Sequence, residues 1–162
     1  MSSGTSRGRH TATPEETALA VDLSKQEYEL LAELRYALRR FAWHTELEAR
    51  KMGLSPQQYQ LLLAIKGFPG REWANISELA ERLQIRHNAV IGLVNRGEVN
   101  GLVRRVQDAD QSDRRIVQVH VTAEGEKALR EMAQALREQR EQLRQVVLEM
   151  ENINAGNGSG ES

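Results

Sequence analysis

The stretch from Ile76 to Asn100 decides the fold of this chain: ISELAERL (76–83), QIR (84–86) and HNAVIGLVNRGEVN (87–100). In the first part, Leu79, Ala80 and Leu83 recur at helical spacing, and Asn75 with Glu78 forms a capping box at its start. The last part has the composition of a second helix, which Gly101 is expected to end. Two short helices joined by three residues predict a helix-turn-helix.

A hairpin pattern follows directly. Residues 102–107 and 115–121 are predicted as two strands, because Val117, Val119 and Val121 alternate with polar residues. The polar run 108–113 between them is typical of a hairpin tip. A helix-turn-helix followed by a hairpin predicts a winged helix.

Capping boxes predict the flanking helices. Ser24 and Ser55 each begin one, with Glu27 and Gln58 three residues later. Thr122 caps a last helix that we expect to run unbroken to about residue 151, with heptad-spaced apolar positions interrupted by Gln139. The predicted fold is therefore mainly α, a winged helix-turn-helix domain with N- and C-terminal helices that form a dimerisation bundle.

The expected organisation has five parts, in chain order. They are a disordered arm, N-terminal dimerisation helices, the winged helix-turn-helix, a C-terminal dimerisation helix and a disordered tail: 1–12, 13–53, 54–121, 122–151 and 152–162. A separate short helix is predicted within the second part, because Thr13, Pro14 and Glu16 have the spacing of a helix start.

Composition narrows the class of protein. The chain has 162 residues, 22 Lys and Arg against 23 Asp and Glu, and no Cys, which excludes disulfides, thiolate zinc sites and thiol sensing. No apolar stretch is long enough to span a membrane, so we expect a cytoplasmic protein that acts without a membrane. The segment 82–115 holds seven Arg, no Lys and four acidic residues. This local positive charge fits either a polyanion-binding face or a salt-bridged surface.

The predicted second helix has two unlike faces. Its apolar face is expected to pack on the first helix and comprises Ala89, Val90, Leu93, Val94 and Gly97. Its other face carries amide, imidazole and small groups, as expected of a helix that reads bases in a major groove: His87, Asn88, Ile91, Gly92, Asn95 and Arg96. An ordinary solvated helix face has a similar pattern, and this alternative stays open.

Arginines of the predicted wing are candidates for DNA contacts. Arg114 and Arg115 at the hairpin tip can reach a minor groove, where negative potential is concentrated. Asp113 can hold Arg115 in place through a charge-assisted bond. Arg104 and Arg105 at the base of the wing are candidate phosphate contacts. Charged residues at an exposed turn are also common without any function.

The chain resembles the MarR-type (multiple antibiotic resistance) regulators. The resemblance rests on ISELAERL (76–83), GLVRR (101–105), DRR (113–115) and VHVTAEG (119–125). It implies a homodimeric winged-helix transcription regulator that binds double-stranded DNA. It further implies that His87, Asn88, Ile91, Gly92 and Asn95 face bases, that Arg86 and Arg96 contact phosphates, and that Arg115, supported by Asp113, enters the minor groove.

Three departures from the family pattern stand out. Gly92 replaces a long side chain, and Gly97 replaces a core Leu. The chain also ends soon after the predicted final helix, so the last helix of the family is expected to be absent or very short.

The heptad seam at residues 129–150 predicts a partner helix. A second copy would cover it and place two reading helices about 34 Å apart, on a pseudo-palindromic site. A bundle within the chain, against residues 25–50, is the competing explanation.

The resemblance also implies a possible small phenolic or aromatic effector. The candidate contacts are Phe41, Trp43, His44 and Tyr59, although core or surface roles explain the same residues. No cofactor or metal is predicted, since His44 and Glu48 alone do not make a site.

The sequence does not predict an enzyme, because its four His are scattered. The predicted function is a transcriptional regulator, of the repressor type, released by an aromatic effector. The alternatives are a winged-helix protein-interaction module and a non-specific DNA binder without effector control.

Overall fold

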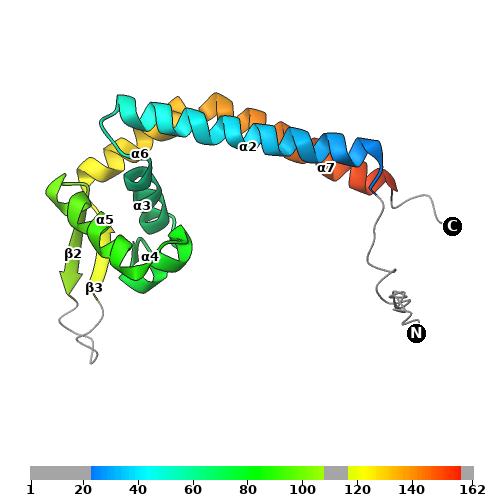
Figure 1. Ribbon diagram of the computed structural model, residues 1–162. Coiled ribbons are helices and arrows are strands. Elements are labelled where there is room, and N and C mark those ends of the chain that lie inside the picture. The colour runs from blue at the N-terminus through cyan, green and yellow to red at the C-terminus, as the bar shows by residue number, and fades with distance from the viewer. Residues whose placement is uncertain (1–22, 108–116, 158–162) are drawn as a thin grey trace, which may run out of the picture.

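The computed structural model describes residues 23–107 and 117–157. They form a mainly helical chain with a small antiparallel sheet, which confirms the predicted fold class (Figure 1). The elements in chain order are α2 Lys25–Lys51, α3 Pro56–Lys66, β1 Trp73–Ala74, α4 Ile76–Leu83, α5 His87–Val99, β2 Val103–Gln107, β3 Val117–Val121, α6 Ala123–Ala135 and α7 Arg137–Asn157. The expected arm at 1–12, the expected helix from Thr13 and residues 158–162 lie outside the described residues.

The predicted capping boxes begin α2, α3 and α4. The side chains of Ser24, Ser55 and Asn75 each accept a hydrogen bond from the backbone N–H three residues later. In return, the side chain of that third residue accepts from the cap backbone. Each box satisfies two backbone N–H groups that a helix start otherwise leaves unpaired, and it therefore fixes the first helical residue.

The turn between α4 and α5 depends on one left-handed residue. Gln84 has a φ of 55° and ends α4, and its side chain donates to the Glu81 carbonyl at 2.6 Å. Gly101 has a φ of 68° and makes the turn that leads from α5 to β2. These two turns set the directions of α4, α5 and the wing.

The sheet has three strands in the order β1-β3-β2. β3 pairs with β2 as predicted, and also with the short extended piece Trp73–Ala74 on its other edge. His120 in β3 lies opposite both Trp73 and Arg104. The wing is therefore attached through β1 to the segment between α3 and α4.

A continuous apolar core lies beneath α5. Helix α3 contributes Leu61, Leu62 and Ile65 to this core. The other helices of the domain and the sheet contribute Leu79, Val90, Leu93, Val94, Val103, Val119 and Met132. Gly97 belongs to the same packed side of α5, where a β-carbon would come within 2.9 Å of a Val103 methyl. The glycine that replaces a core Leu thus lets β2 approach α5 closely.

The predicted unbroken final helix is wrong, because the structure divides it into α6 and α7 at Leu136. Leu136 has φ −96° and ψ 9° and is completely buried. The heptad pattern continues through this position and gave no sign of the break. α7 also continues to Asn157, where a tail from residue 152 was expected. A long last helix is therefore present, contrary to the expectation of its loss.

α2 and α7 lie side by side and form an arm that projects from the rest of the chain (Figure 1). Phe41 of α2 and Leu143 and Val146 of α7 border one small cavity between the two helices. Part of the heptad seam is therefore covered within the chain, as the competing explanation held. No helix of the described segments combines the length and apolarity needed to cross a bilayer.

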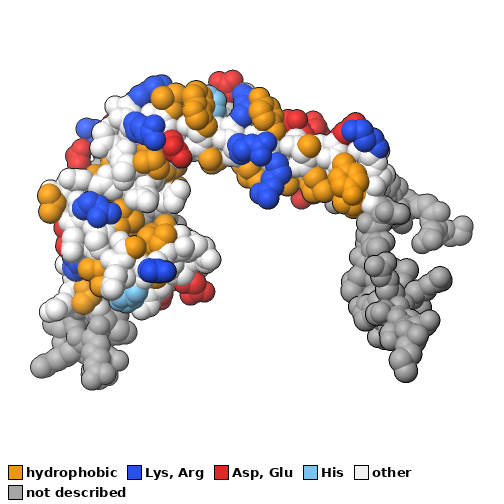
Figure 2. Space-filling view, in the orientation of Figure 1, with side chains coloured by type: hydrophobic (Ala, Val, Ile, Leu, Met, Phe, Trp, Pro, Cys, Tyr) orange, Lys and Arg blue, Asp and Glu red, His pale blue; other side chains and the backbone are white. Residues whose placement is uncertain are grey.

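The arm still exposes a large apolar surface. Orange side chains are spread along it in Figure 2. Its exposed large residues are Tyr28, Leu31, Tyr36, Leu38, Trp43, Val147 and Leu148. The bundle within one chain therefore leaves much of the apolar surface of both helices in solvent.

Candidate nucleic-acid interface

α5 is half embedded in the core and half exposed. Val90, Leu93, Val94 and Gly97 are buried, as expected of its apolar face, whereas Ala89, predicted on that face, is exposed. On the other side His87, Asn88, Asn95 and Arg96 are exposed, and Ile91 and Gly92 are partly exposed. The six candidate base and phosphate contacts on α5 thus share one accessible face.

Gly92 makes a gap in the middle of that face. Asn88, Gly92 and Asn95 are spaced by four and three residues and lie in one row along α5. A β-carbon on Gly92 would meet a terminal guanidinium nitrogen of Arg96 at 3.4 Å. The Arg96 side chain therefore lies beside the gap between the two asparagines.

The start of α5 carries no side-chain cap. Arg86 occupies the cap position in an extended conformation, is exposed, and makes no capping hydrogen bond. The Ala89 N–H donates to the Arg86 carbonyl at 2.9 Å, so the N–H groups of His87 and Asn88 are left for another acceptor. Phosphate is a suitable acceptor at a helix N-terminus. Arg86 adds a positive charge at the same end.

A three-residue network joins α5 to the wing. Arg105 of β2 pairs with the Glu98 carboxylate through Nη1 and donates from Nη2 to Asn95 Oδ1 at 2.7 Å. The Arg105 backbone N–H also donates to Glu98 Oε1 at 2.9 Å. Arg105, a candidate phosphate contact in the sequence analysis, therefore bonds to other residues of the protein. This network was missed because its members come together only once β2 is placed beside α5.

Arg104 lies on the opposite face of β2 from Arg105 and is exposed. Its strand partner is His120, whose Nε2 lies 2.9 Å from Gln118 Oε1. Burial, with the positive charge of Arg104 as the smaller cause, lowers the pKa of His120 below its ordinary value of 6.5. The remaining wing candidates, Asp113, Arg114 and Arg115, lie outside the described residues.

A groove of about 440 Å³ lies where α2, α3, α6 and the start of α7 meet. Two of the effector candidates, Phe41 and Tyr59, line it, and so do the following residues: Ala42, Thr45, Glu46, Pro56, Gln60, Leu63, Leu129, Ala133 and Arg140. Burial raises the pKa of the Tyr59 hydroxyl, and the nearby Arg140 opposes that shift. The groove thus combines apolar walls with a phenol and a guanidinium.

The other two effector candidates lie elsewhere. His44 borders the small cavity between α2 and α7, of about 100 Å³, together with Phe41. Trp43 is 61% exposed and contacts His44 edge-on, with ring centroids 4.8 Å apart. The four candidates therefore do not meet in one site. Within residues 23–107 and 117–157, no three His, Asp or Glu side chains form a group that could hold a metal ion.

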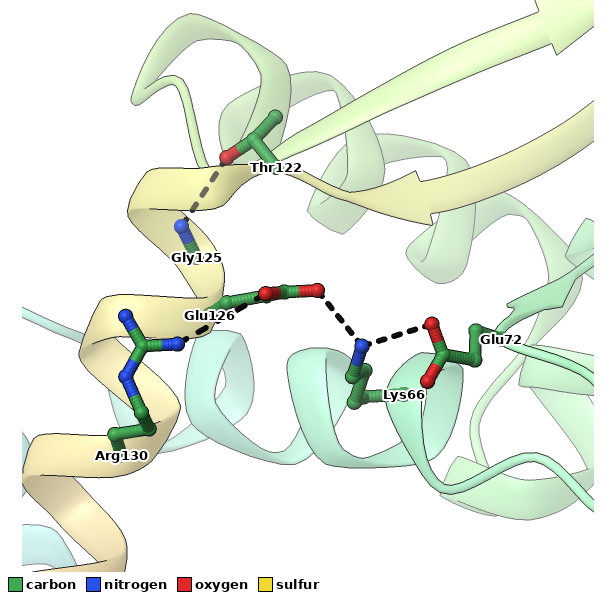
Figure 3. Close-up of polar contacts among 6 residues, drawn as sticks. All are labelled: Lys66, Glu72, Thr122, Gly125, Glu126 and Arg130. Atoms are coloured by element: carbon green, nitrogen blue, oxygen red, sulfur yellow. Dashed lines mark hydrogen bonds and ion pairs between the residues drawn. The ribbon is translucent and has the colours of Figure 1, made fainter.

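An ion-pair network closes the edge of a second groove between α3 and α6 (Figure 3). Lys66 Nζ lies 2.7 Å from Glu126 Oε1 and 2.8 Å from Glu72 Oε2, and Arg130 pairs with Glu126 at 3.8 Å. The hydrogen bond from Lys66 lowers the pKa of Glu126, and the same bond raises the pKa of Lys66. The network ties the end of α3 and the loop after it to the first turns of α6.

Comparisons with known proteins agree with this architecture. Residues 52–116 match the family model described as MarR family, and no curated protein matches the chain.

Solved structures of similar fold cover most of the chain. The transcriptional regulator BldR from Sulfolobus solfataricus is 27% identical, with a TM-score of 0.59 over 84% of this chain and 96% of that one. A mutant E. coli MarR complexed with operator DNA is 17% identical, with a TM-score of 0.60 over 83% and 97% of the two chains. Bordetella bronchiseptica BpsR, whose DNA binding is regulated by 6-hydroxynicotinic acid, is 17% identical, with a TM-score of 0.56 over 80% and 93%.

The helix-turn-helix, the wing strands and the long flanking helices occur in the order that the sequence resemblance implied. The match over residues 52–116 makes this segment similar to the MarR family, and the flanking helices share the fold of the solved regulators.

Proposed function

We propose that the chain is a sequence-specific DNA-binding transcription regulator of the repressor type, which reads the major groove with α5. The observation that carries this proposal is the exposed face of α5, where Asn88 and Asn95 present amides on a helix whose other side is fixed in the core. Amide side chains on an accessible helix recognise base edges, and Arg86 and Arg96 beside them are suited to phosphates. This activity needs no catalytic group and acts in the cytoplasm.

The wing would extend the contact beyond the major groove. In this proposal Arg115, supported by Asp113 and accompanied by Arg114, enters the neighbouring minor groove. Arg104 is exposed at the base of the wing and would contact a phosphate. His87, Ile91 and Gly92 complete the surface that faces the bases.

The regulator would act as a homodimer. Leu31, Leu38 and Val147 are each about two-fifths exposed although they are large and apolar. A single chain leaves this surface of the arm uncovered, and a second copy with the same surface can cover it by two-fold symmetry. Two α5 helices would then read a pseudo-palindromic site with half-sites about 34 Å apart.

An aromatic effector would bind in the groove where α2, α3, α6 and the start of α7 meet. Its walls offer apolar surface from Phe41 and Leu129, and Arg140 with the Tyr59 hydroxyl can bind an acid or phenol group. The regulation of BpsR by 6-hydroxynicotinic acid, a small aromatic acid, supports this ligand class. The groove lies between the arm and the reading module, so an occupant can change their relative position.

The test is fluorescence anisotropy with a labelled duplex of the region upstream of the chain's own coding sequence. Asn88→Ala and Arg115→Ala are each expected to weaken binding by roughly tenfold or more, since each removes a contact to base or groove. Lys25→Ala is the control, because this lysine lies at the far end of the arm in an exposed ion pair with Glu29. Equal affinity for a shuffled duplex would indicate a non-specific binder, and no binding at low salt would favour a protein-interaction module.

The effector is tested with 6-hydroxynicotinate and benzoate as the probes. Either compound at millimolar concentration is expected to release the duplex from the wild-type chain. Arg140→Gln is expected to abolish that response while it leaves DNA binding intact, because the groove loses its cation. Arg137→Gln, on the same helix but outside the groove, is the control. No release from the wild-type chain by either probe would contradict this ligand class.

A further inference from the structure

We propose that Asn95 reads a hydrogen-bond acceptor on a base edge through its amide nitrogen alone, and that Arg105 is the positioning residue that fixes this orientation. The inference rests on the proposed function, because it assigns a specificity to one position of the reading helix.

The orientation of Asn95 follows from the chemistry of its partner. Arg105 Nη2 lies 2.7 Å from the Asn95 side chain. A guanidinium has only donors, so the Asn95 atom that faces it has to be the carbonyl oxygen Oδ1. The amide nitrogen, with its two N–H groups, is then directed away from Arg105.

Arg105 itself is held firmly. Its Nη1 pairs with one oxygen of the Glu98 carboxylate, and its backbone N–H donates to the other oxygen at 2.9 Å. The side chains of Arg105 and Glu98 are only 28% and 33% exposed, so water competes weakly for this charge-assisted pair. Glu98 lies one turn beyond Asn95 on α5. The guanidinium therefore has a fixed position relative to the asparagine it orients.

The same pairing explains why Arg105 is not a phosphate contact. The Glu98 carboxylate neutralises its charge, and two of its terminal nitrogens are already bonded within the protein. A phosphate would also be repelled by Glu98. The function left for this arginine on the α5 side of the wing is to set the Asn95 amide.

Asn95 and Asn88 then differ in what they can recognise. Within the described residues the Asn88 side chain has no hydrogen-bond partner, so it can offer both its oxygen and its nitrogen, the pattern that suits adenine. Asn95 offers a donor only. In the major groove, guanine and thymine present acceptors at O6, N7 and O4, and adenine presents an acceptor at N7 beside its N6 donor, whereas cytosine presents only the N4 donor. Asn95 should therefore favour guanine or thymine over cytosine at the base it contacts.

The experiment is selection of bound duplexes from a random library by the full chain, wild type against Asn95→Asp. Aspartate keeps an oxygen for Arg105 but loses the donor. One position of each half-site is expected to change from guanine or thymine to cytosine or adenine, which offer amino donors. The ratio of affinities for the two bases at that position should change by about tenfold or more in favour of the donor base.

Two further variants separate specificity from charge and from packing. Asn100→Asp adds the same charge at the exposed C-terminal end of α5, away from Arg105, and is expected to leave the selected sequence unchanged. Arg105→Met releases the Asn95 amide, and it is expected to relax the preference at the same position while the others persist. Thermal unfolding of this variant confirms that it is folded.

The outcomes distinguish the two proposals. A wild-type consensus that Asn95→Asp leaves unchanged at every position overturns the assignment of Asn95 alone. A loss of preference in Arg105→Met at all positions equally would overturn the positioning function of Arg105. If the wild-type chain enriches no common sequence, the proposed reading of DNA fails, and the inference fails with it.

Discussion

Gly125 of α6 lies directly against the backbone of Leu102, so that a β-carbon on Gly125 would overlap the Leu102 carbonyl oxygen. The same carbonyl accepts a hydrogen bond from the Thr122 backbone N–H at 3.0 Å, and the Thr122 hydroxyl accepts from the Gly125 N–H at 3.1 Å (Figure 3). The glycine therefore allows the start of α6 to pack against the residue that precedes β2. This contact connects the base of the wing with the helix that leads to the arm.

Gly125→Ala is expected to lower the free energy of unfolding by about 2–3 kcal/mol, because the clash is with backbone and cannot be relieved by a rotamer change. Urea denaturation followed by circular dichroism measures it. Gly92→Ala is the matched control, since its β-carbon meets only the end of the Arg96 side chain at 3.4 Å. The control should be neutral or more stable by up to about 1 kcal/mol, from helix propensity. Equal effects of the two substitutions would contradict the packing account.

Leu38→Glu on the arm is expected to dissociate the proposed homodimer. Leu38 is 42% exposed in the single chain, and burial of that exposed part stabilises by roughly 1 kcal/mol in each of two copies. Glutamate would lose this contribution and would also place a charge in the interface of each copy. The dimer should therefore weaken by roughly a hundredfold or more, which sedimentation velocity over a concentration series detects. Val99→Glu makes the same change at a residue of α5 that is 87% exposed, and it should leave the mass unaltered. A wild-type chain that sediments as a monomer at all concentrations would contradict the dimer.

Lys66→Met is expected to destabilise the chain at neutral pH, and less so in acid. The lowered pKa of Glu126 means that its ion pair with Lys66 stabilises the fold fully above the ordinary value of 4.5. This contribution is lost as the pH falls through the lowered value, because the folded state then also binds the proton. Methionine keeps the apolar stem of lysine, so the difference in Tm between wild type and variant should shrink from pH 7 to pH 3. A constant difference across that range would show that the charge is not the cause.

The His120 imidazole is expected to titrate below pH 6.5 in the folded chain. Burial is the main cause, and the positive charge of Arg104 adds to it. Its neighbours on the sheet are Trp73, Gln118 and Arg104. NMR titration of the ring protons measures the midpoint, and Arg104→Gln should raise it without restoring 6.5.

The lowered pKa of His120 also makes the stability of the fold depend on pH. The neutral imidazole stabilises the fold above pH 6.5, and this contribution is lost as the pH falls through the folded pKa. A titration midpoint above 6.5 would contradict both the burial and the charge effect.

Features set by neighbours in sequence could be predicted, and those set by distant partners could not. The starts of α2, α3 and α4 follow from Ser24, Ser55 and Asn75, because a capping box needs only residues three apart. The break at Leu136 is tertiary in origin, since the apolar pattern runs through it. The pairing of Trp73 with His120 joins residues far apart in the chain.

Some features of the candidate interface and of the groove could likewise be predicted from the sequence, and others could not. The exposed face of α5 was predicted from helical spacing, with Ala89 as the exception. The bond between Asn95 and Arg105 was not, because it depends on how β2 folds back beside α5. The grouping of Phe41 with Tyr59, apart from Trp43, likewise depends on the angle between α2 and α3.

Leu136 interrupts the last helical stretch at a point that is wholly inside the core. A bend in a solvent-exposed loop can change at little cost, but a bend built on a buried side chain changes only when its neighbours rearrange. In the proposed homodimer, the direction of α7, and with it the distance between the two α5 helices, would therefore depend on how Leu136 packs. If the proposed homodimer binds DNA, substitutions of Leu136 should change the preferred half-site separation and leave the preferred bases of each half-site unchanged.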